Sequence, residues 1–525
     1  MDVSHTKTQL TNTRYPIAMN EVTTWLNNTE EQLESVARQM SAAQWTLYSE
    51  GKRSEVDEKT QAFQESFGNF ETWKRVQELH LSDTVFAPQT RRRIELLYRI
   101  LSREHVRSRP QIHGTITDAV SQLTRFRAKL FESSYTDSEL QKILNAEPDR
   151  ATREAAWRAR TEIAHSLKQP ILDLAILRNK AARALGFSGF REIGLLTAGQ
   201  DCNNLKHTLK HLKQSTDEEW VKCVQRQKSR LGLERLRPWD MHFEDPELNM
   251  QLARLLPKEE TLKHMKQSFL EMGIDLDRSE LTMDMESRDG KSQHAYCFPI
   301  DPPHDVRVLA NISDGLASCE TLFHEMGHAV QALNVKQNFY SLKDTPNDAL
   351  SEGCAQLFAY LCHEPEWLKH SLKLDDKSIA RIQTRNRAKR LASLRWMLIW
   401  VAVEEAIFQN PQEDPTAFFW DLYEEIIGLE TTKELRGTPV WARVPHFVTH
   451  PIYVQNYVVA ELVASQLKAE IVRQFGSIWG RPEVGPWIIR HCFEGGAELS
   501  STEWLIKCTG SELGISDYIA DVISN

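Results

Sequence analysis

Apolar residues recur at three- and four-residue spacing from about residue 18 to residue 230 of the chain. The segments between them are rich in Glu, Lys, Gln, Arg and Leu and poor in Gly and Pro, which is typical of amphipathic helices. Clear examples lie at 95–106, 118–131 and 218–232, and the last closes on Gly232, as a helix end commonly does. This half of the chain is therefore predicted to be nearly all helix.

The helical spacing breaks at residues 236–247, where two prolines, a tryptophan and several acidic residues interrupt it. We place a joint there. It divides the chain into an N-terminal helical lobe, residues 1–235, and a second region, residues 236–525, and we expect the two to form one functional unit.

Residues 281–312 change character, because two runs of strand-forming residues flank an Asp289-Gly290 step. Such a step is a hairpin signal, so this stretch is the best candidate for a small sheet. After residue 315 helical spacing returns and continues to the end of the chain, apart from a loop-like patch at 437–451. The predicted fold class is therefore mainly α with one small β-sheet.

The composition of the chain argues against two classes of partner, nucleic acid and membrane. The chain has 64 Lys and Arg against 73 Asp and Glu, a net charge of -9, and the charges are scattered, which argues against a nucleic-acid partner. The most apolar run, residues 396–403, is far shorter than the roughly 20 residues of a membrane span and predicts a buried helix.

Two further features concern the cellular compartment. The N-terminus is polar from its first residue and has no secretory signal pattern. The eight cysteines are dispersed without a C-x-x-C pair, which indicates reduced thiols. We therefore expect a cytoplasmic protein with no membrane partner, and the sequence leaves the oligomeric state open.

The strongest chemical signal is H-E-x-x-H, which occurs at residues 324–328 within an apolar helical stretch. In a helix, His324 and His328 lie one turn apart on one face, so both imidazoles can reach a single metal ion. Glu325 projects near the open position of such an ion and can take a proton from water before it attacks a carbonyl group. This pattern predicts a zinc-dependent hydrolase with Glu325 as the catalytic base.

A catalytic zinc site needs a third protein ligand. Glu352 begins a second apolar helix 28 residues after His324, and Gln356 follows one turn later as a candidate hydrogen-bond partner of the site. The alternative is that Glu352 only caps a helix, but the upstream motif favours the ligand. The predicted metal ligands are His324, His328 and Glu352.

FHEMGH followed by SEGCAQ resembles the zinc peptidases of the thimet oligopeptidase and oligoendopeptidase F family. Further landmarks similar to the family, in its order, are Pro238-Trp239-Asp240, Gly290-Lys291, Ala295-Tyr296-Cys297, residues 441–447, Gly495-Gly496 and Thr509-Gly510. The resemblance implies a two-lobed helical zincin-type peptidase with a small sheet beside a deep active-site channel. It also implies one Zn²⁺ per chain and short peptides as substrates.

Other features are similar to angiotensin-converting enzyme, a relative in the same zincin group. His446 is followed seven residues later by Tyr453, which is similar to that enzyme's substrate-contacting pair, and His294-Ala295 is similar to its substrate-binding strand. The resemblance implies catalytic roles for His446 and Tyr453, as donors to a developing oxyanion.

The remaining substrate contacts follow from the same resemblance. It implies substrate binding by His294, Ala295 and Tyr457, while the second family tyrosine corresponds to Tyr457 or is absent. Aromatic packing at a helix start is the alternative for residues 445–457. The strand at 307–312 resembles the sheet edge that pairs with a peptide backbone, which would give broad substrate tolerance.

Three other histidines can be considered as metal or substrate ligands. His207 and His211 are also four residues apart, but Thr208 stands at the base position and lysines surround them, which favours a solvated helix face. His304 lies near the expected sheet and is better explained as part of a turn.

The sequence thus predicts a metallopeptidase that cuts short oligopeptides internally. A dipeptidyl carboxypeptidase of the angiotensin-converting enzyme type is the alternative within the enzyme class. The alternative outside it is a catalytically silent peptide-binding protein on the same fold, and the intact H-E-x-x-H and Glu352 argue against it.

Overall fold

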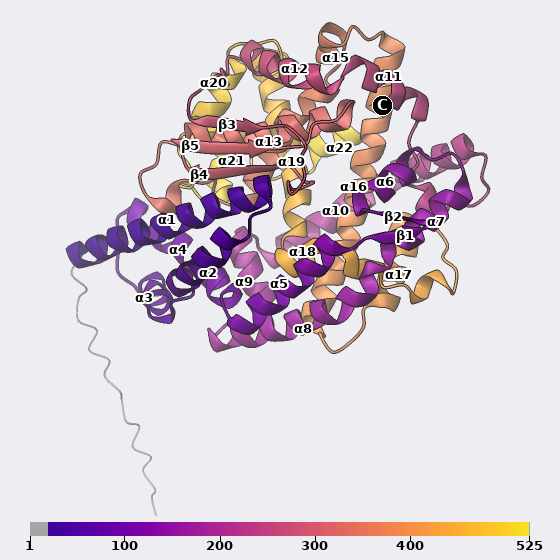
Figure 1. Cartoon of the computed structure of the whole chain (residues 1–525). Helices are drawn as coiled ribbons and strands as arrows, with labels where there is room; N and C mark the ends of the chain where they lie inside the picture. The colour runs from indigo at the N-terminus through magenta and orange to yellow at the C-terminus, as the bar shows by residue number, and fades with distance from the viewer. Residues whose placement is uncertain (1–18, 524–525) are drawn as a thin grey trace, which may run out of the picture.

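The computed structural model describes residues 19–523, and the chain is mainly α-helical with only small sheets, as the sequence predicts (Figure 1). The helices of the N-terminal half are α1 (Met19–Glu50), α2 (Ser54–Phe67), α3 (Phe70–His80), α4 (Pro88–Arg107), α5 (Pro110–Arg125), α6 (Asp137–Ala146), α7 (Arg150–Thr161), α8 (Ile163–Ala184), α9 (Phe190–Ala198) and α10 (Cys202–Leu231). Gly232 ends α10 in a left-handed conformation with φ of 63°, which confirms the predicted stop.

The second region is also built mainly from helices. Its α-helices are α11 (Pro246–Leu255), α12 (Lys258–Glu271), α13 (Leu316–Asn334), α14 (Asp348–Ala359), α15 (Pro365–Ser371), α16 (Asp376–Gln409), α17 (Thr416–Ile427), α18 (Pro445–Thr449), α19 (Val454–Phe475), α20 (Val484–Ile488), α21 (Ser501–Thr509) and α22 (Ser516–Val522). The apolar run at 396–403 lies inside α16, where Ile399 and Val403 are fully buried. Within residues 19–523, no helix combines the length and apolarity that crossing a membrane requires.

Two short strands interrupt the N-terminal helices, and the sequence did not predict them. β1 (Ala128–Leu130) pairs antiparallel with β2 (Ser133–Tyr135). The predicted helix at 118–131 is therefore wrong from residue 126 onward, since α5 ends at Arg125. Ala128 and Leu130 bury their side chains from a strand instead, an alternation that helical spacing cannot distinguish in so short a stretch.

The predicted joint contains a buried ion cluster. A 3₁₀ turn at Pro238–Asp240 carries Asp240, whose side chain is fully buried. Asp240 accepts hydrogen bonds from Arg150 Nη2 at 2.7 Å and from Arg153 Nη2 at 3.1 Å, and both arginines lie on α7. This contact fastens residues 238–240 to the N-terminal helices, and the division at residue 235 stays a prediction.

The larger sheet has three strands, β3 (Leu281–Asp284), β4 (Tyr296–Asp301) and β5 (Asp305–Leu309), in the order β3-β5-β4. β5 is parallel to β3 and antiparallel to β4. The predicted small sheet is therefore present, but its hairpin joins β4 to β5 and does not turn at Asp289-Gly290. The expectation that residues 307–312 form a sheet edge is also wrong, because β5 is paired on both sides.

Asp289 and Gly290 do form a tight turn, in which the backbone N–H of Lys291 donates to the Arg288 carbonyl oxygen at 3.3 Å, but this turn joins strands that are not paired with each other. The side chain of Lys291 holds the turn in place. Its ammonium group is buried and donates to the carbonyl oxygens of Asp284, Glu286 and Ala310 at 2.8–3.0 Å, and to the Asp284 carboxylate at 2.9 Å. Gly290, with φ of 84°, lies against the backbone of Glu50 and Gly51 at the end of α1. The loop is thus held against both the sheet and α1.

Helix α1 packs on the sheet, as Figure 1 shows at β4. A separate apolar cluster joins them, in which Trp45 and Tyr48 of α1 contact Phe298 of β4 at ring-centroid distances of 5.7 Å. Phe298 and Ile300 alternate along β4 and therefore lie on one face of the sheet, and α1 covers that face.

Helices α13, α14 and α19 are packed unusually closely. A Cβ atom on Gly327 of α13 would lie 2.8 Å from the backbone Cα of Ala355 on α14. A Cβ atom on Gly353 of α14 would lie 2.7 Å from Val463 Cβ on α19. Glycine at these two positions lets the backbones approach, and α14 is held between its two neighbours.

We expect Gly353→Ala to lower the free energy of unfolding by about 1–3 kcal/mol, because the added methyl group overpacks the α14–α19 contact. Chemical denaturation followed by circular dichroism measures the change. Gly114→Ala is the matched control, since a Cβ there meets nothing within 4 Å in α5, and it should stabilise by roughly 0.5–1 kcal/mol through helix propensity. Equal effects of the two substitutions would contradict the packing argument.

Candidate metal centre

Helix α13 places two histidines side by side. His324 and His328 lie one turn apart, with ring centroids 4.9 Å apart, and both side chains are mostly buried. The surrounding helix residues Leu322, Phe323 and Met326 have no exposed surface. Burial of this apolar face orients the helix, so that both imidazoles point toward α14.

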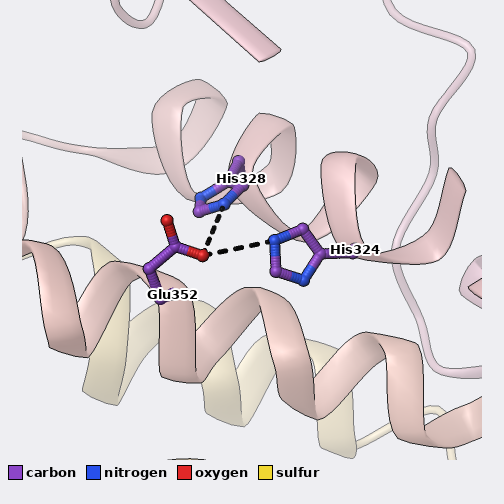
Figure 2. Close-up of side chains that lie close together, drawn as sticks. All are labelled: His324, His328 and Glu352. Atoms are coloured by element: carbon purple, nitrogen blue, oxygen red, sulfur yellow. Dashed lines mark ion pairs between the residues drawn. The ribbon is translucent and has the colours of Figure 1, made fainter. Parts of the chain in front are cut away.

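Glu352 reaches the same point from α14. Its Oε2 lies 3.4 Å from Nε2 of His324 and 3.9 Å from Nε2 of His328, and Figure 2 shows both rings directed at this one oxygen. The three donor atoms lie within 4.8 Å of one another. Donors around a tetrahedral zinc ion are separated by about 3.3 Å. Two neutral nitrogens and one carboxylate oxygen at these spacings therefore fit a zinc ion.

A hydrogen-bonded chain supports His328 from behind. His328 Nδ1 lies 3.2 Å from Ser351 Oγ, which donates to Gln331 Oε1 at 3.0 Å, and Gln331 donates to Asp344 at 2.9 Å. His324 is hydrogen-bonded to Gln356, the residue that the sequence suggested for this place. Such partners fix the tautomer and orientation of metal-binding imidazoles. Ser351, Gln331 and Asp344 were not foreseen, because no spacing in the sequence links them.

The charges of the site are strongly coupled. Burial tends to raise the pKa of Glu352, but hydrogen bonding to His324 and the charges of both histidines lower it to about 2. Burial tends to lower the pKa of His324, but its contacts with Glu352 and Glu325 raise it overall. Burial, and then the charge of His324, lower the pKa of His328 to about 4. Glu352 is thus held as an anion, which is the form that binds a cation.

Glu325 lies between the two histidines in sequence and faces the sheet. Burial raises its pKa to about 7, against the attraction of His324, and its carboxylate accepts a hydrogen bond from the backbone N–H of Cys297. Cys297 is the second residue of β4, so the first residues of this strand lie next to the side chain of Glu325. A carboxylate with a pKa near neutrality suits proton transfer in both directions.

His294 and Ala295 come immediately before β4, next to this strand end. His294 is exposed, and its charge contributes to lowering the pKa of Asp137 at the start of α6. The structure thus brings this pair near the strand that reaches Glu325.

The aromatic residues of the predicted substrate cluster also meet here. Tyr453, the N-cap of α19, donates its hydroxyl proton to Glu352 Oε1 at 2.8 Å. His446 of α18 lies 3.1 Å from the hydroxyl of Tyr457, and its ring is 6.1 Å from that of Tyr453. Burial raises the pKa of both tyrosines, so both hydroxyls keep their protons.

The structure agrees with the sequence that His207, His211 and His304 are not part of the metal site. The rings of His207 and His211 lie 4.0 Å apart on α10 at an interplanar angle of 48°, but no third donor joins them in the described part of the chain. The backbone N–H of His304 donates to Asp301 at 2.6 Å in the turn between β4 and β5. Within residues 19–523, only His324, His328 and Glu352 form a group of three that suits a metal.

A family model describes much of the chain. The model of peptidase family M3 matches it in two consecutive segments, residues 143–275 and 276–472. Together these segments cover more than half of the sequence and include all three candidate ligands. No curated protein matches the chain significantly.

Proposed function

The chain belongs to peptidase family M3, and on this premise we propose that it hydrolyses short oligopeptides with one zinc ion held by His324, His328 and Glu352. Family membership confirms the resemblance seen in the sequence and makes the chain a metallopeptidase. The observation that carries the finer proposal is the convergence of three donor atoms within 4.8 Å from two adjacent helices. A zinc ion bound there supplies Lewis acidity, which acidifies water and polarises a carbonyl group.

Glu325 is the proposed base. Its carboxylate lies beside the donor set, and a pKa of about 7 allows it to take a proton from the attacking water and return it to the leaving amine. The Cys297 N–H holds one side of the carboxylate in place.

His446, Tyr453 and Tyr457 are the proposed contacts of the reacting carbonyl group. Their rings lie within 6.1 Å of one another. The hydroxyl of Tyr453 contacts Glu352, and that of Tyr457 contacts His446. Such donors stabilise an oxyanion when they are already oriented. Tyr453 also orients Glu352 through its 2.8 Å hydrogen bond, so it has a positioning role as well.

The free edge of β4 is the proposed site for the peptide backbone, with His294 and Ala295 at its beginning. β4 is an edge strand, and its first residues adjoin Glu325. Main-chain pairing gives affinity without strict sequence demand, which suits a peptidase of broad tolerance. Restriction to short peptides by a deep channel remains an inference from the family resemblance.

Metal analysis tests this function. Purified protein is expected to hold about one zinc per chain, and chelation is expected to abolish cleavage of a mixed peptide pool, which added zinc restores. The double variant His207→Ala and His211→Ala should behave like wild type, since it removes the other histidine pair. Cleavage that survives removal of the metal would refute the proposal.

The products of the same pool separate the two peptidase types. Internal cuts and cleavage of C-terminally amidated peptides indicate an oligoendopeptidase. Release of dipeptides from free C-termini alone indicates a dipeptidyl carboxypeptidase. Mass spectrometry of the digests gives the answer.

A further inference from the structure

Two buried side chains of opposite charge hold the backbone between His446 and Tyr453. They are Arg178 of α8 and Glu404 of α16, which come from distant parts of the chain. We propose that both are positioning residues for the peptidase reaction, because they fix the segment that carries His446 and Tyr453. This inference rests on the proposed function, in which these two residues contact the reacting carbonyl group.

Arg178 holds the first part of the segment. Its Nη1 donates to the carbonyl oxygen of Phe447 at 2.9 Å, and its Nη2 donates to the carbonyl oxygen of Val448 at 2.5 Å. A longer α18 would pair the Phe447 oxygen with the N–H group of residue 451, but that residue is Pro451 and has none. The guanidinium group takes the place of helical donors. The residue that follows His446 is therefore fixed to α8.

Glu404 holds the last part of the segment. Its Oε1 accepts a hydrogen bond at 2.8 Å from the backbone N–H of Ile452, which comes immediately before Tyr453. Gln455 Nε2 donates to the carbonyl oxygen of Ile452 at 2.8 Å, so both the N–H and the C=O of this residue are engaged. Ile452 has a φ of 56°, in the left-handed region that β-branched residues rarely adopt. Such a conformation persists only where surrounding contacts determine it.

Helix α9 contacts the same residue from a third side. A Cβ atom on Gly194 would lie 2.5 Å from Cβ of Ile452, closer than two carbon atoms can approach unless one of them moves. The side chain of Ile452 is itself buried. Its N–H is therefore held by α16, its carbonyl oxygen by α19 and its side chain by α9.

Tyr453 connects this segment to the metal centre. Its hydroxyl donates to Glu352 Oε1 at 2.8 Å, and its ring is 6.1 Å from that of His446. A shift of the backbone at residue 452 would move this hydroxyl relative to Glu352 and to the carbonyl group that it is proposed to contact. Donors to an oxyanion act when they are already oriented, and a misplacement of about 1 Å can cost on the order of a hundredfold in rate.

The two charges are compensated partly by the segment itself. Carbonyl groups of the segment face the cation, and an N–H group faces the anion. Burial lowers the pKa of Arg178, and the charge of Glu404 raises it. Burial raises the pKa of Glu404, and the N–H of Ile452 and then the charge of Arg178 lower it. Loss of either side chain therefore leaves buried polar groups of the segment without their partner, which is costly.

A double-mutant cycle tests the inference. Glu404→Met removes the acceptor and should lower kcat for a cleaved peptide by about ten- to hundredfold, while KM changes by less than about threefold. In the Tyr453→Phe background the same substitution should cost less than about threefold, because the hydroxyl that Glu404 positions is already absent. Glu404→Gln should keep most of the wild-type rate, since its side-chain oxygen can still accept from Ile452.

A second variant displaces the segment without removing a charge. Gly194→Ala pushes on Ile452 from α9, so it keeps the inference testable if Glu404→Met does not fold. It should also lower kcat, and its effect should also shrink in the Tyr453→Phe background. A Gly194→Ala protein with wild-type kcat would contradict the inference.

Arg395→Met is the matched control for the loss of a buried charge. Arg395 is a fully buried arginine of α16, the helix that carries Glu404, but it donates to Thr216 and Asp217 of α10. Arg395→Met should lower the stability of the protein and leave kcat of the folded protein at the wild-type value. Stability is measured for every variant, so that a loss of folded protein is not mistaken for a loss of kcat.

Fluorine NMR gives a readout that needs neither turnover nor metal. In protein labelled with 3-fluorotyrosine, the resonance of Tyr453 is the one missing from Tyr453→Phe. It should shift in Glu404→Met and stay in place in Arg395→Met. Additive losses of kcat in the cycle, or an unshifted resonance in Glu404→Met, would overturn the inference and leave the peptidase function intact. If wild type cleaves no peptide, the proposed function fails, and the NMR comparison still decides whether Glu404 positions Tyr453.

Discussion

Replacing Glu325 by glutamine should lower kcat for peptide hydrolysis by about 10²- to 10⁴-fold and leave the zinc content unchanged. General-base catalysis contributes an effect of this size, and an amide cannot accept the proton from water. Glutamine has the same shape and can still accept the hydrogen bond from Cys297, so the fold of the site is kept. Steady-state kinetics with a quenched fluorescent peptide, together with metal analysis, measures both quantities.

Glu259→Gln on α12 is the matched control, because this carboxylate is exposed and pairs only loosely with Lys258 at 3.9 Å. It should leave kcat at the wild-type value. Substantial turnover by Glu325→Gln with one bound zinc would remove Glu325 from the role of base and point to another proton acceptor.

Replacing Glu352 by glutamine should lower zinc affinity by more than a hundredfold and abolish hydrolysis with it. Oε2 of Glu352 is the atom that both imidazoles approach, and an uncharged amide is a poor zinc ligand. Loss of a supporting hydrogen bond costs only about 10- to 100-fold in affinity. Competition with a zinc-binding dye distinguishes these ranges.

Tyr453→Phe provides the comparison, since it removes the hydrogen bond to Glu352 Oε1 and leaves the carboxylate of Glu352 in place. Its zinc affinity should fall within the smaller range, while kcat falls through loss of the hydroxyl near the carbonyl. A Glu352→Gln protein that binds zinc as tightly as wild type would show that Glu352 is not a ligand.

The local parts of this site could be predicted from sequence, because a helix fixes the relation of residues four apart. His324, Glu325 and His328 needed only the period of the helix. Glu352 needed a second apolar helix and the upstream H-E-x-x-H motif, and the structure brings it to the same point from α14. The helices were predicted well where apolar spacing was long, as in α10.

Contacts between distant segments could not be predicted in this way. In the order β3-β5-β4, buried Lys291 bonds both to Asp284 at the end of β3 and to Ala310 just after β5, and an Asp-Gly step says nothing about those contacts. The chain from His328 through Ser351 to Gln331 and Asp344 depends on how α13 and α14 cross. Tyr453 was expected at a substrate carbonyl, but its bond to Glu352 emerged only in three dimensions.

The glycine contacts of α14 also bear on which ions can enter. Because Gly327 and Gly353 have no side chains, α14 lies close to α13 at the first glycine and close to α19 at the second. This close packing limits how far the helices that carry the three donor atoms can move apart. Calcium forms bonds of about 2.3–2.6 Å and gathers six to eight oxygens, for which the helices would have to separate. That separation is opposed by the whole interface on both sides of α14. We therefore expect the two glycine contacts to keep the three donor atoms close together, at a spacing that suits the shorter bonds of zinc better than those of calcium.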